Sequence, residues 1–61
     1  MTVYLKGLGS RCDQVEKDVQ SVKVTDKHIV IRYEPLSQYH HPLVTGVTYY
    51  TDEMKIEQVE E

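Results

Sequence analysis

The stretch SVKVTDKHIVIRYE, residues 21–34, has the clearest structural pattern in the chain. Apolar residues alternate with polar ones on both sides of Asp26 and Lys27, which predicts two strands joined by a two-residue turn. Val24 then lies opposite Ile29, and a one-residue shift would move one strand's apolar set to the other side, so the pattern itself specifies the register. The turn lacks the glycine that such hairpins favour. The apolar side chains expected on one buried face are Val22, Val24, Ile29, Ile31 and Tyr33.

Two different patterns precede this hairpin. Residues 2–6, TVYLK, alternate and predict a half-buried strand that ends at Gly7. Ser10 and Asp13 then resemble a capping box, which marks the start of a helix. The apolar residues that follow have helical spacing, three, four and three positions apart; they are Cys12, Val15, Val19 and Val22. We therefore expect a short helix over residues 11–19, with Cys12 in the core. The alternative is a long polar loop.

The last third of the chain repeats the hairpin pattern after a loop at residues 35–42 that begins and ends with proline. With Asp52 and Glu53 as the turn, Tyr49 faces Ile56. One face then carries Leu43, Thr45, Val47, Tyr49, Met54 and Ile56, and the other carries Val44, Tyr50 and Val59. Both hairpins contain Thr-Asp before a charged residue. Aligned on this turn, their faces are inverted, which indicates shared turn chemistry rather than a duplication.

These elements predict a single domain over residues 1–61 that is α+β or mainly β. About five short strands, in two hairpins, would form a small antiparallel sheet with the short helix over one face. An SH3-like small β-barrel is the alternative. Phe and Trp are absent, so the core consists of Val, Ile, Leu, Met and Tyr. A domain of this size buries only about 60% of its unfolded surface, so it gains from a partner, a metal or another staple.

Composition and charge disfavour several classes of protein. The single cysteine, Cys12, rules out a disulfide within one chain and favours a reducing, cytoplasmic location. The first residues lack the apolar region of a secretion signal, and no apolar run reaches the ~20 residues that cross a bilayer. The net charge is −3 and the Lys and Arg residues are scattered, whereas nucleic-acid binding depends on a basic patch. We therefore expect neither a membrane nor a nucleic acid as a direct partner.

The adjacent histidines, His40 and His41, raise the question of a metal site. Neighbouring residues on an extended chain point in opposite directions, and a metal needs two or three further ligands. None of the other candidate ligands lies at a recurring zinc spacing; they are His28, Cys12, Asp26 and Asp52. We therefore interpret the pair as part of a solvated loop, and expect no metal and no cofactor.

Two further motifs favour chemistry only weakly. The sequence KGLGSR, residues 6–11, resembles a phosphate-binding loop, but Cys12 stands where the dinucleotide fingerprint has its third glycine. Cys12 and a histidine would make a nucleophile pair only if they were adjacent in space and next to an oxyanion site. We interpret the glycines as turn residues and expect no enzymatic activity.

Surface contacts fit the composition better. Tyrosine is enriched at protein interfaces, and Tyr39, in the proline-bracketed loop, has no core pattern around it. The face opposite the expected core carries apolar residues that would merge into one patch; they are Tyr4, Val30, Val44, Tyr50 and Val59. A symmetric dimer would cover this patch. We therefore expect a homodimer with Tyr50 and Val30 in the seam.

The sequence thus predicts a small non-enzymatic protein-interaction module, such as an accessory, adaptor or inhibitor protein. Its partner is another protein or a second copy of the chain, and the residues expected to make contact are Tyr39, His40, His41, Tyr50 and Val30. A metal-binding or catalytic module built on histidine and cysteine is one alternative. Another is an acidic inhibitor of a nucleic-acid enzyme, of the kind that phages encode, because residues 52–61 are rich in Asp and Glu.

Overall fold

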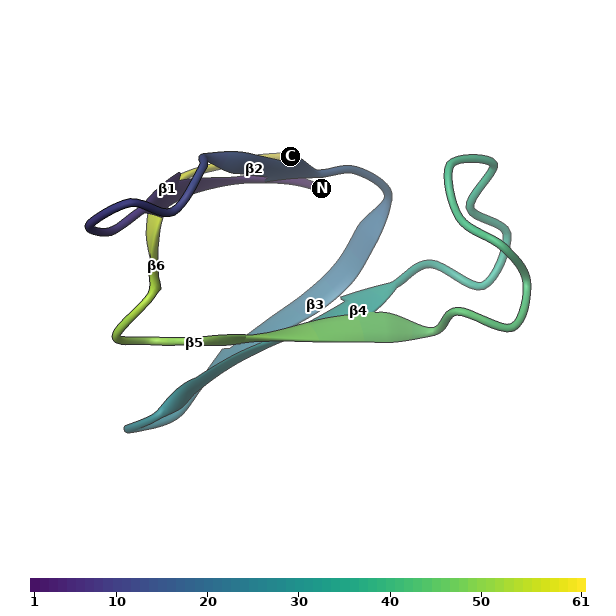
Figure 1. Cartoon of the computed structure of the whole chain (residues 1–61). Helices are drawn as coiled ribbons and strands as arrows, with labels where there is room; N and C mark the ends of the chain where they lie inside the picture. The colour runs from purple at the N-terminus through teal and green to yellow at the C-terminus, as the bar shows by residue number, and fades with distance from the viewer.

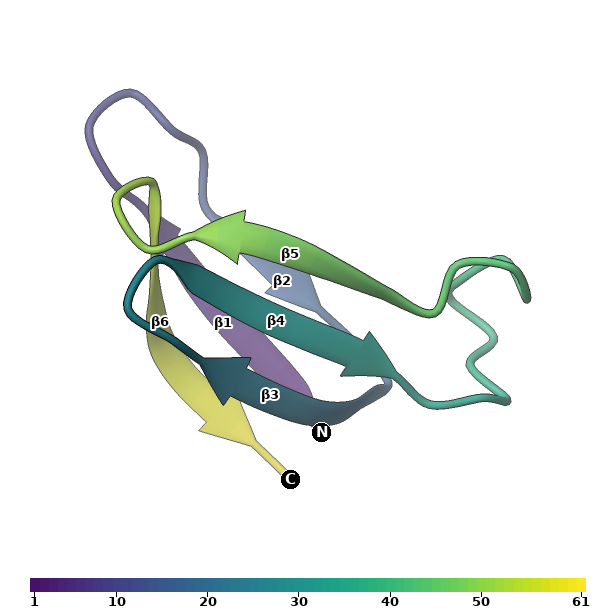
Figure 2. The same ribbon diagram turned by 90° about the horizontal axis from the view of Figure 1, so that it is seen from below.

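The computed structural model describes all residues from 1 to 61 and contains six strands and no helix. The strands are β1 (Thr2–Gly7), β2 (Gln14–Glu16), β3 (Val19–Val24), β4 (His28–Tyr33), β5 (Gly46–Tyr50) and β6 (Met54–Glu60). They form two three-stranded antiparallel sheets, of order β2-β1-β6 and β3-β4-β5. The sheets are stacked as two layers (Figure 1 and Figure 2). The prediction of a small, mainly β fold is confirmed.

The finer layout differs from the prediction. The structure has six strands in place of about five, no helix covers a sheet, and the strands form two sheets rather than one sheet or one closed barrel. Because all elements are strands, there is no helix long and apolar enough to cross a membrane.

The hairpin of β3 and β4 has the predicted register. Val24 lies opposite Ile29, and Val22 lies opposite Ile31. The apolar set therefore shares one side, as the alternation requires. Val24 is nevertheless 59% exposed, because it is the last residue of β3 and lies at the open end of the core. The prediction of its face holds, but the prediction that it is buried is wrong.

The backbone geometry of this turn explains why the hairpin forms without a glycine. Neither Asp26 nor Lys27 has a positive φ, so an ordinary side chain is not strained at either position. The Thr25 N–H donates to the His28 carbonyl at 2.8 Å. The hydroxyl Oγ1 of Thr25 accepts the His28 N–H at 3.1 Å. The side chain of Thr25 thus helps to close this turn, whereas in a glycine-containing turn the backbone geometry of the glycine does so.

The turn at residues 51–53 does not form the predicted second hairpin. β5 pairs with β4, and β6 pairs with β1, so this turn carries the chain from one sheet to the other. Tyr49 lies opposite Ile29 rather than Ile56, and Ile56 lies opposite Leu5. Each strand pairs with a partner that is distant in sequence. Local alternation reports which side of a strand is buried, but it does not report which strand is its neighbour.

The predicted helix over residues 11–19 is wrong. β2 occupies the middle of this segment and pairs with β1, so that Glu16 lies opposite Val3. Val15 points away from the core and is exposed, and Cys12 is exposed rather than buried. A helix of this length has a costly nucleus, whereas an extended segment satisfies its backbone groups against the edge of β1. Tertiary pairing therefore overrides the helical spacing.

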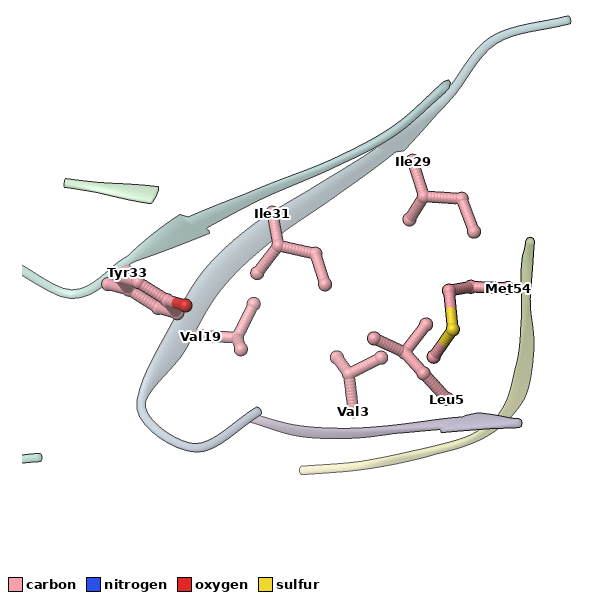
Figure 3. Packing of buried hydrophobic residues seen from close by; sticks show 7 residues of the cluster. All are labelled: Val3, Leu5, Val19, Ile29, Ile31, Tyr33 and Met54. Atoms are coloured by element: carbon pink, nitrogen blue, oxygen red, sulfur yellow. The ribbon is translucent and has the colours of Figure 1, made fainter. Parts of the chain in front are cut away.

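The core lies between the two sheets, where side chains of β1 and β6 point toward those of β3 and β4 (Figure 3). The buried apolar residues are Val3, Leu5, Val19, Ile29, Ile31, Tyr33 and Met54. Ile31, on the central strand β4, is fully buried. Val22, Val47 and Ile56 are partly buried and pack against this cluster. One small core therefore joins the two sheets.

Short connections fasten the sheets at two corners. The chain passes from β2 to β3 through Asp18, whose φ of 53° is in the left-handed region. There the amino group of Met1 donates to the Val19 carbonyl, and the Val19 N–H donates to the Met1 carbonyl, both at 2.9 Å. At the other corner the Leu8 N–H donates to the Glu53 carbonyl at 2.9 Å, which continues the β1–β6 ladder up to the turn at residues 51–53. The bonds between Met1 and Val19 join the two sheets.

Candidate interaction surface

The connection between β4 and β5, residues 34–45, extends beyond the two sheets at one end of the molecule (Figure 1 and Figure 2). In this β4–β5 loop, Leu36 is 96% exposed and Leu43 is 85% exposed. Tyr39 and Val44 are exposed as well. Leu43 was expected on the core face of a hairpin, and that prediction is wrong. The loop therefore presents several large apolar side chains to solvent, close together in the chain.

Hydrogen bonds give the β4–β5 loop a defined shape. At its base, the Tyr33 N–H donates to the Thr45 carbonyl at 2.9 Å. His41 organises the turn that follows. Its carbonyl accepts the Val44 N–H at 2.8 Å, and its ring Nδ1 accepts the Leu43 N–H at 3.1 Å. The exposed side chain of Leu43 is thus attached to a backbone that His41 holds in place.

His40 anchors the loop to the body of the molecule. Its ring stacks on that of Tyr33, with centroids 3.5 Å apart and planes 11° apart. Its Nε2 lies 3.0 Å from the Lys17 carbonyl, and since a carbonyl only accepts, Nε2 carries the hydrogen. Lys17 Nζ in turn lies 5.3 Å from the centroid of the Tyr39 ring, within cation–π range. His40 is therefore partly buried, and the prediction that both histidines are solvated holds only for His41.

A buried carboxylate lies behind this anchor. Glu16 is only 8% exposed, and each of its oxygens accepts a phenol. Tyr33 Oη donates to Oε2 at 2.8 Å, and Tyr49 Oη donates to Oε1. Burial raises the pKa of both tyrosines well above the usual value, and the hydrogen bond to Glu16 raises it further. The group links β2 of one sheet to β4 and β5 of the other.

This Glu16–Tyr33–Tyr49 cluster was missed by sequence reasoning. The expected helix over residues 11–19 gave no indication that Glu16 is buried, since an ionised carboxylate is rarely buried unless it is paired. Its partners lie 17 and 33 residues away in the chain. The only signal in the sequence was the surplus of tyrosine over the needs of a small core. Because both carboxylate oxygens already accept hydrogen bonds, the cluster acts as a cross-link.

The other candidate groups lie apart. His28 begins β4, at the end opposite the β4–β5 loop, and its ring lies tilted against that of Tyr50, with the centroids 5.2 Å apart. Cys12 is exposed on the segment before β2. No group of three or more His, Cys, Asp or Glu side chains is placed to hold a metal ion. In the glycine-rich segment, the Gly7 N–H donates to Asp13 Oδ1 at 2.9 Å. Asp13, which was expected to cap a helix, therefore closes the loop between β1 and β2.

The apolar patch predicted for a dimer seam is not one surface. Val30 and Tyr50 lie on the outer side of the β3-β4-β5 sheet, whereas Tyr4 lies on the outer side of the other sheet. Val59 lies opposite Val3, because a bulge in β6 shifts the register between Ile56 and Gln58. Val44 belongs to the β4–β5 loop. Of the predicted patch, only the Val30–Tyr50 pair remains together.

Comparison of the chain with protein-family models, with curated proteins and with solved structures finds no match.

Proposed function

We propose that this protein is a small, non-enzymatic interaction module that binds a partner protein through the β4–β5 loop. The observation that carries the proposal is the near-complete exposure of Leu36 and Leu43 on a loop whose backbone is held by hydrogen bonds. Apolar side chains that gather in one exposed region are typical of contact surfaces. Loops on a rigid scaffold are also where binding residues concentrate.

The anchoring of the loop supports this role energetically. Binding has to offset the entropy lost when a mobile segment becomes ordered, and a segment that is already ordered loses less. The stack of His40 on Tyr33 and the bond to Lys17 hold the middle of the β4–β5 loop. The bonds to His41 hold the residues that follow it, Leu43 and Val44. In this proposal His40 and His41 position the contact residues Leu36, Tyr39 and Leu43.

Affinity capture with matched variants tests the proposal. Tagged full-length protein is incubated with lysate of the native host, and bound proteins are quantified by mass spectrometry. The double variant Leu36→Ser, Leu43→Ser should lose a specific partner that the original chain retains. Val15→Ser is the control, because Val15 is an exposed apolar residue on the outer side of the other sheet. Equal capture by all three proteins would overturn the proposal.

A second copy of the chain is one partner that needs a separate measurement. Sedimentation equilibrium at tens of micromolar should give a dimer mass if the loop, or the Val30–Tyr50 pair, binds its own copy. A dimer that the double loop variant dissociates would identify the loop as the seam. A monomer mass would direct the search to a different protein.

A further inference from the structure

The outer side of the β3-β4-β5 sheet carries positive charge and no carboxylate. The side chains opposite to the buried Ile29 and Ile31 point outward on all three strands; they are Ser21, Lys23, His28, Val30, Arg32, Thr48 and Tyr50, with Gly46 between them. The chain as a whole has ten acidic and seven basic residues, so a face with two cations and no acid has the opposite sign to its surroundings. We refer to these residues as the basic face.

The two cations on this face are not paired within the molecule. Arg11 and Glu53 form the only salt bridge in the structure. Lys23 lies opposite Val30, and Arg32 lies two residues further along β4, which makes the two residues diagonal neighbours whose Cα atoms are about 7–8 Å apart. Like charges at this spacing repel each other weakly. Because neither side chain forms a salt bridge within the molecule, the N–H groups of Lys23 and Arg32 are available to a ligand that carries two carboxylates.

A partly apolar hollow lies beside the cations. Gly46 pairs with Arg32, and a Cβ at Gly46 would lie 2.4 Å from the Ile31 carbonyl oxygen, so no other residue fits there. A hollow of about 260 Å³ lies beside Gly46, with Val30, Arg32 and Thr48 among its lining residues. That volume is enough for a leucine-sized or aromatic side chain. Tyr50, which is 53% exposed, extends the apolar area toward His28.

We propose that the basic face binds an extended acidic segment of a partner protein. Residues i and i+2 of a strand point to the same side and lie about 6.6 Å apart, which matches the spacing of Lys23 and Arg32. Two carboxylates at these positions would pair with the cations, and a neighbouring apolar side chain would enter the hollow at Gly46. The motif expected in the partner is therefore two acidic residues separated by one residue, next to an apolar residue.

The same observations favour a peptide over a nucleic acid. A phosphate backbone is a continuous line of charge that requires a long basic track, and the basic face has only two full positive charges. The net charge of −3 repels an extended polyanion at long range. A short segment with two carboxylates avoids most of that repulsion. Apart from Thr45, which lines the hollow, this surface lies outside the β4–β5 loop, and the proposal does not depend on the loop's function.

The test is selection from a display library of short random peptides on the full-length protein. The peptides enriched should carry two acidic residues separated by one residue and an adjacent apolar residue. The dissociation constant of a selected peptide, measured by fluorescence anisotropy, should rise about tenfold in the variant Lys23→Gln, Arg32→Gln, since two surface ion pairs are lost. It should also rise with salt concentration, because salt screens such pairs.

A matched control removes two other cations. Lys6 and Lys55 lie opposite each other and are exposed on the other sheet, so Lys6→Gln, Lys55→Gln makes the same change in net charge and should leave peptide affinity unchanged. Leu36→Ser, Leu43→Ser should leave it unchanged as well, which separates this result from a failure of the loop proposal. Circular dichroism melts check that every variant folds.

Four outcomes would overturn the proposal. The first is that the selected peptides lack the acidic pair, and the second is that the Lys6, Lys55 control loses as much affinity. The third is that oligo(dT) displaces the peptide. The fourth is that the protein self-associates and that this association disappears in Lys23→Gln, Arg32→Gln. The third would assign the face to nucleic acid. The fourth would assign it to a second copy of this chain.

Discussion

The turns at residues 25–27 and 51–53 have similar sequences and different roles. Both contain Thr-Asp followed by a charged residue, between strands that alternate. The first returns the chain to a neighbouring strand of the same sheet, and the second passes it to the opposite sheet. A turn sequence therefore reverses the chain but does not choose the strand with which the next segment pairs. That choice depends on which sheet edges are free.

The two turns are also bonded to each other. The Thr51 N–H donates to the Lys27 carbonyl, and Thr51 Oγ1 donates to the Asp26 carbonyl, both at 3.0 Å. Thr25, in contrast, bonds only within its own turn, to His28. The first turn forms from local contacts, and the second is held against the first. Local structure thus supports non-local structure at this corner.

The largest effect expected concerns the strand that follows the first turn. Ile31 is fully buried on β4, which pairs with both β3 and β5. Ile31→Ala should lower the free energy of unfolding by about 2–5 kcal/mol, as for other buried large-to-small substitutions. Denaturant unfolding followed by circular dichroism measures this loss. Lys23→Ala, on the outer side of the same hairpin, is the control and should change the free energy by less than about 0.5 kcal/mol.

The contrast between the turns also explains how far sequence reasoning reaches. The register of β3 and β4 was predicted next to their turn, where the paired residues lie within residues 21–34, but the shift that pairs Val19 with Tyr33 was not predicted. The face of β1 was predicted because Val3 and Leu5 alternate with polar neighbours. The strand order was not predictable in this way, because the partners of β5 and β6 lie in distant segments.

The candidate surface shows the same limit. The loop between two prolines and the exposure of Tyr39 followed from the absence of a core pattern. The anchoring of His40 did not, because its partners Tyr33 and Lys17 come from other parts of the chain. The burial of Glu16 was missed for a similar reason. A buried carboxylate is recognisable only once the phenols that bind it have been placed.

The next largest effect tests the Glu16–Tyr33–Tyr49 cluster, which joins the two sheets in addition to the second turn. In Glu16→Gln, the amide oxygen still accepts one phenol, but the amide nitrogen cannot accept the other. The hydrogen of one phenol then lacks its acceptor, which should lower the free energy of unfolding by about 1–3 kcal/mol. Glu57→Gln, at an exposed position of β6, is the control. A double-mutant cycle with Tyr49→Phe should give a clear coupling energy, whereas additivity would mean that the cross-link contributes nothing.

Alkaline titration examines the same cross-link without changing Glu16. The pKa of Tyr33 and of Tyr49 is raised in the folded protein above the usual value of 10.0, mainly by burial and then by the bond to Glu16. The unfolded chain therefore loses these protons first. Stability should be fully present below pH 10 and fall above it by ~1.4 kcal/mol per pH unit for each tyrosine.

Substitution separates this slope from general alkaline unfolding. Tyr33→Phe should reduce the slope above pH 10 by the contribution of one proton, although the variant itself is less stable. Tyr39→Phe changes an exposed tyrosine of the β4–β5 loop and should leave the slope as it is. Urea unfolding at several pH values provides the measurement. A slope that is identical in all three proteins would show that the buried phenols do not control alkaline stability.

A smaller effect distinguishes the two turns directly. Thr51→Val removes the hydroxyl that bonds to Asp26, and Thr25→Val removes the hydroxyl that closes the first turn. Each should lower the free energy of unfolding by about 0.5–1.5 kcal/mol, the usual net value of one hydrogen bond. Amide hydrogen exchange should tell them apart. Thr51→Val should speed exchange in both turns, and Thr25→Val mainly in its own.

The smallest effect concerns the third connection, the β4–β5 loop, where adjacent histidines have unequal roles. His40 stacks on Tyr33 and bonds to Lys17, so His40→Ala should lower the free energy of unfolding by about 0.5–1.5 kcal/mol, the range of one aromatic pair. His41 is exposed and bonds only within the loop, so His41→Ala should change it by less than about 0.5 kcal/mol. Thermal melts of the two single variants measure the difference. For the backbone of the loop, His41→Ala should have the larger effect of the two. It releases the Leu43 N–H and should increase the exchange rate of this amide, although the core is unaffected. Both variants could instead match the unaltered protein in melting temperature and in the amide exchange of the loop. In that case neither histidine would hold the β4–β5 loop, and the two prolines at its ends would be the only restraint on its order.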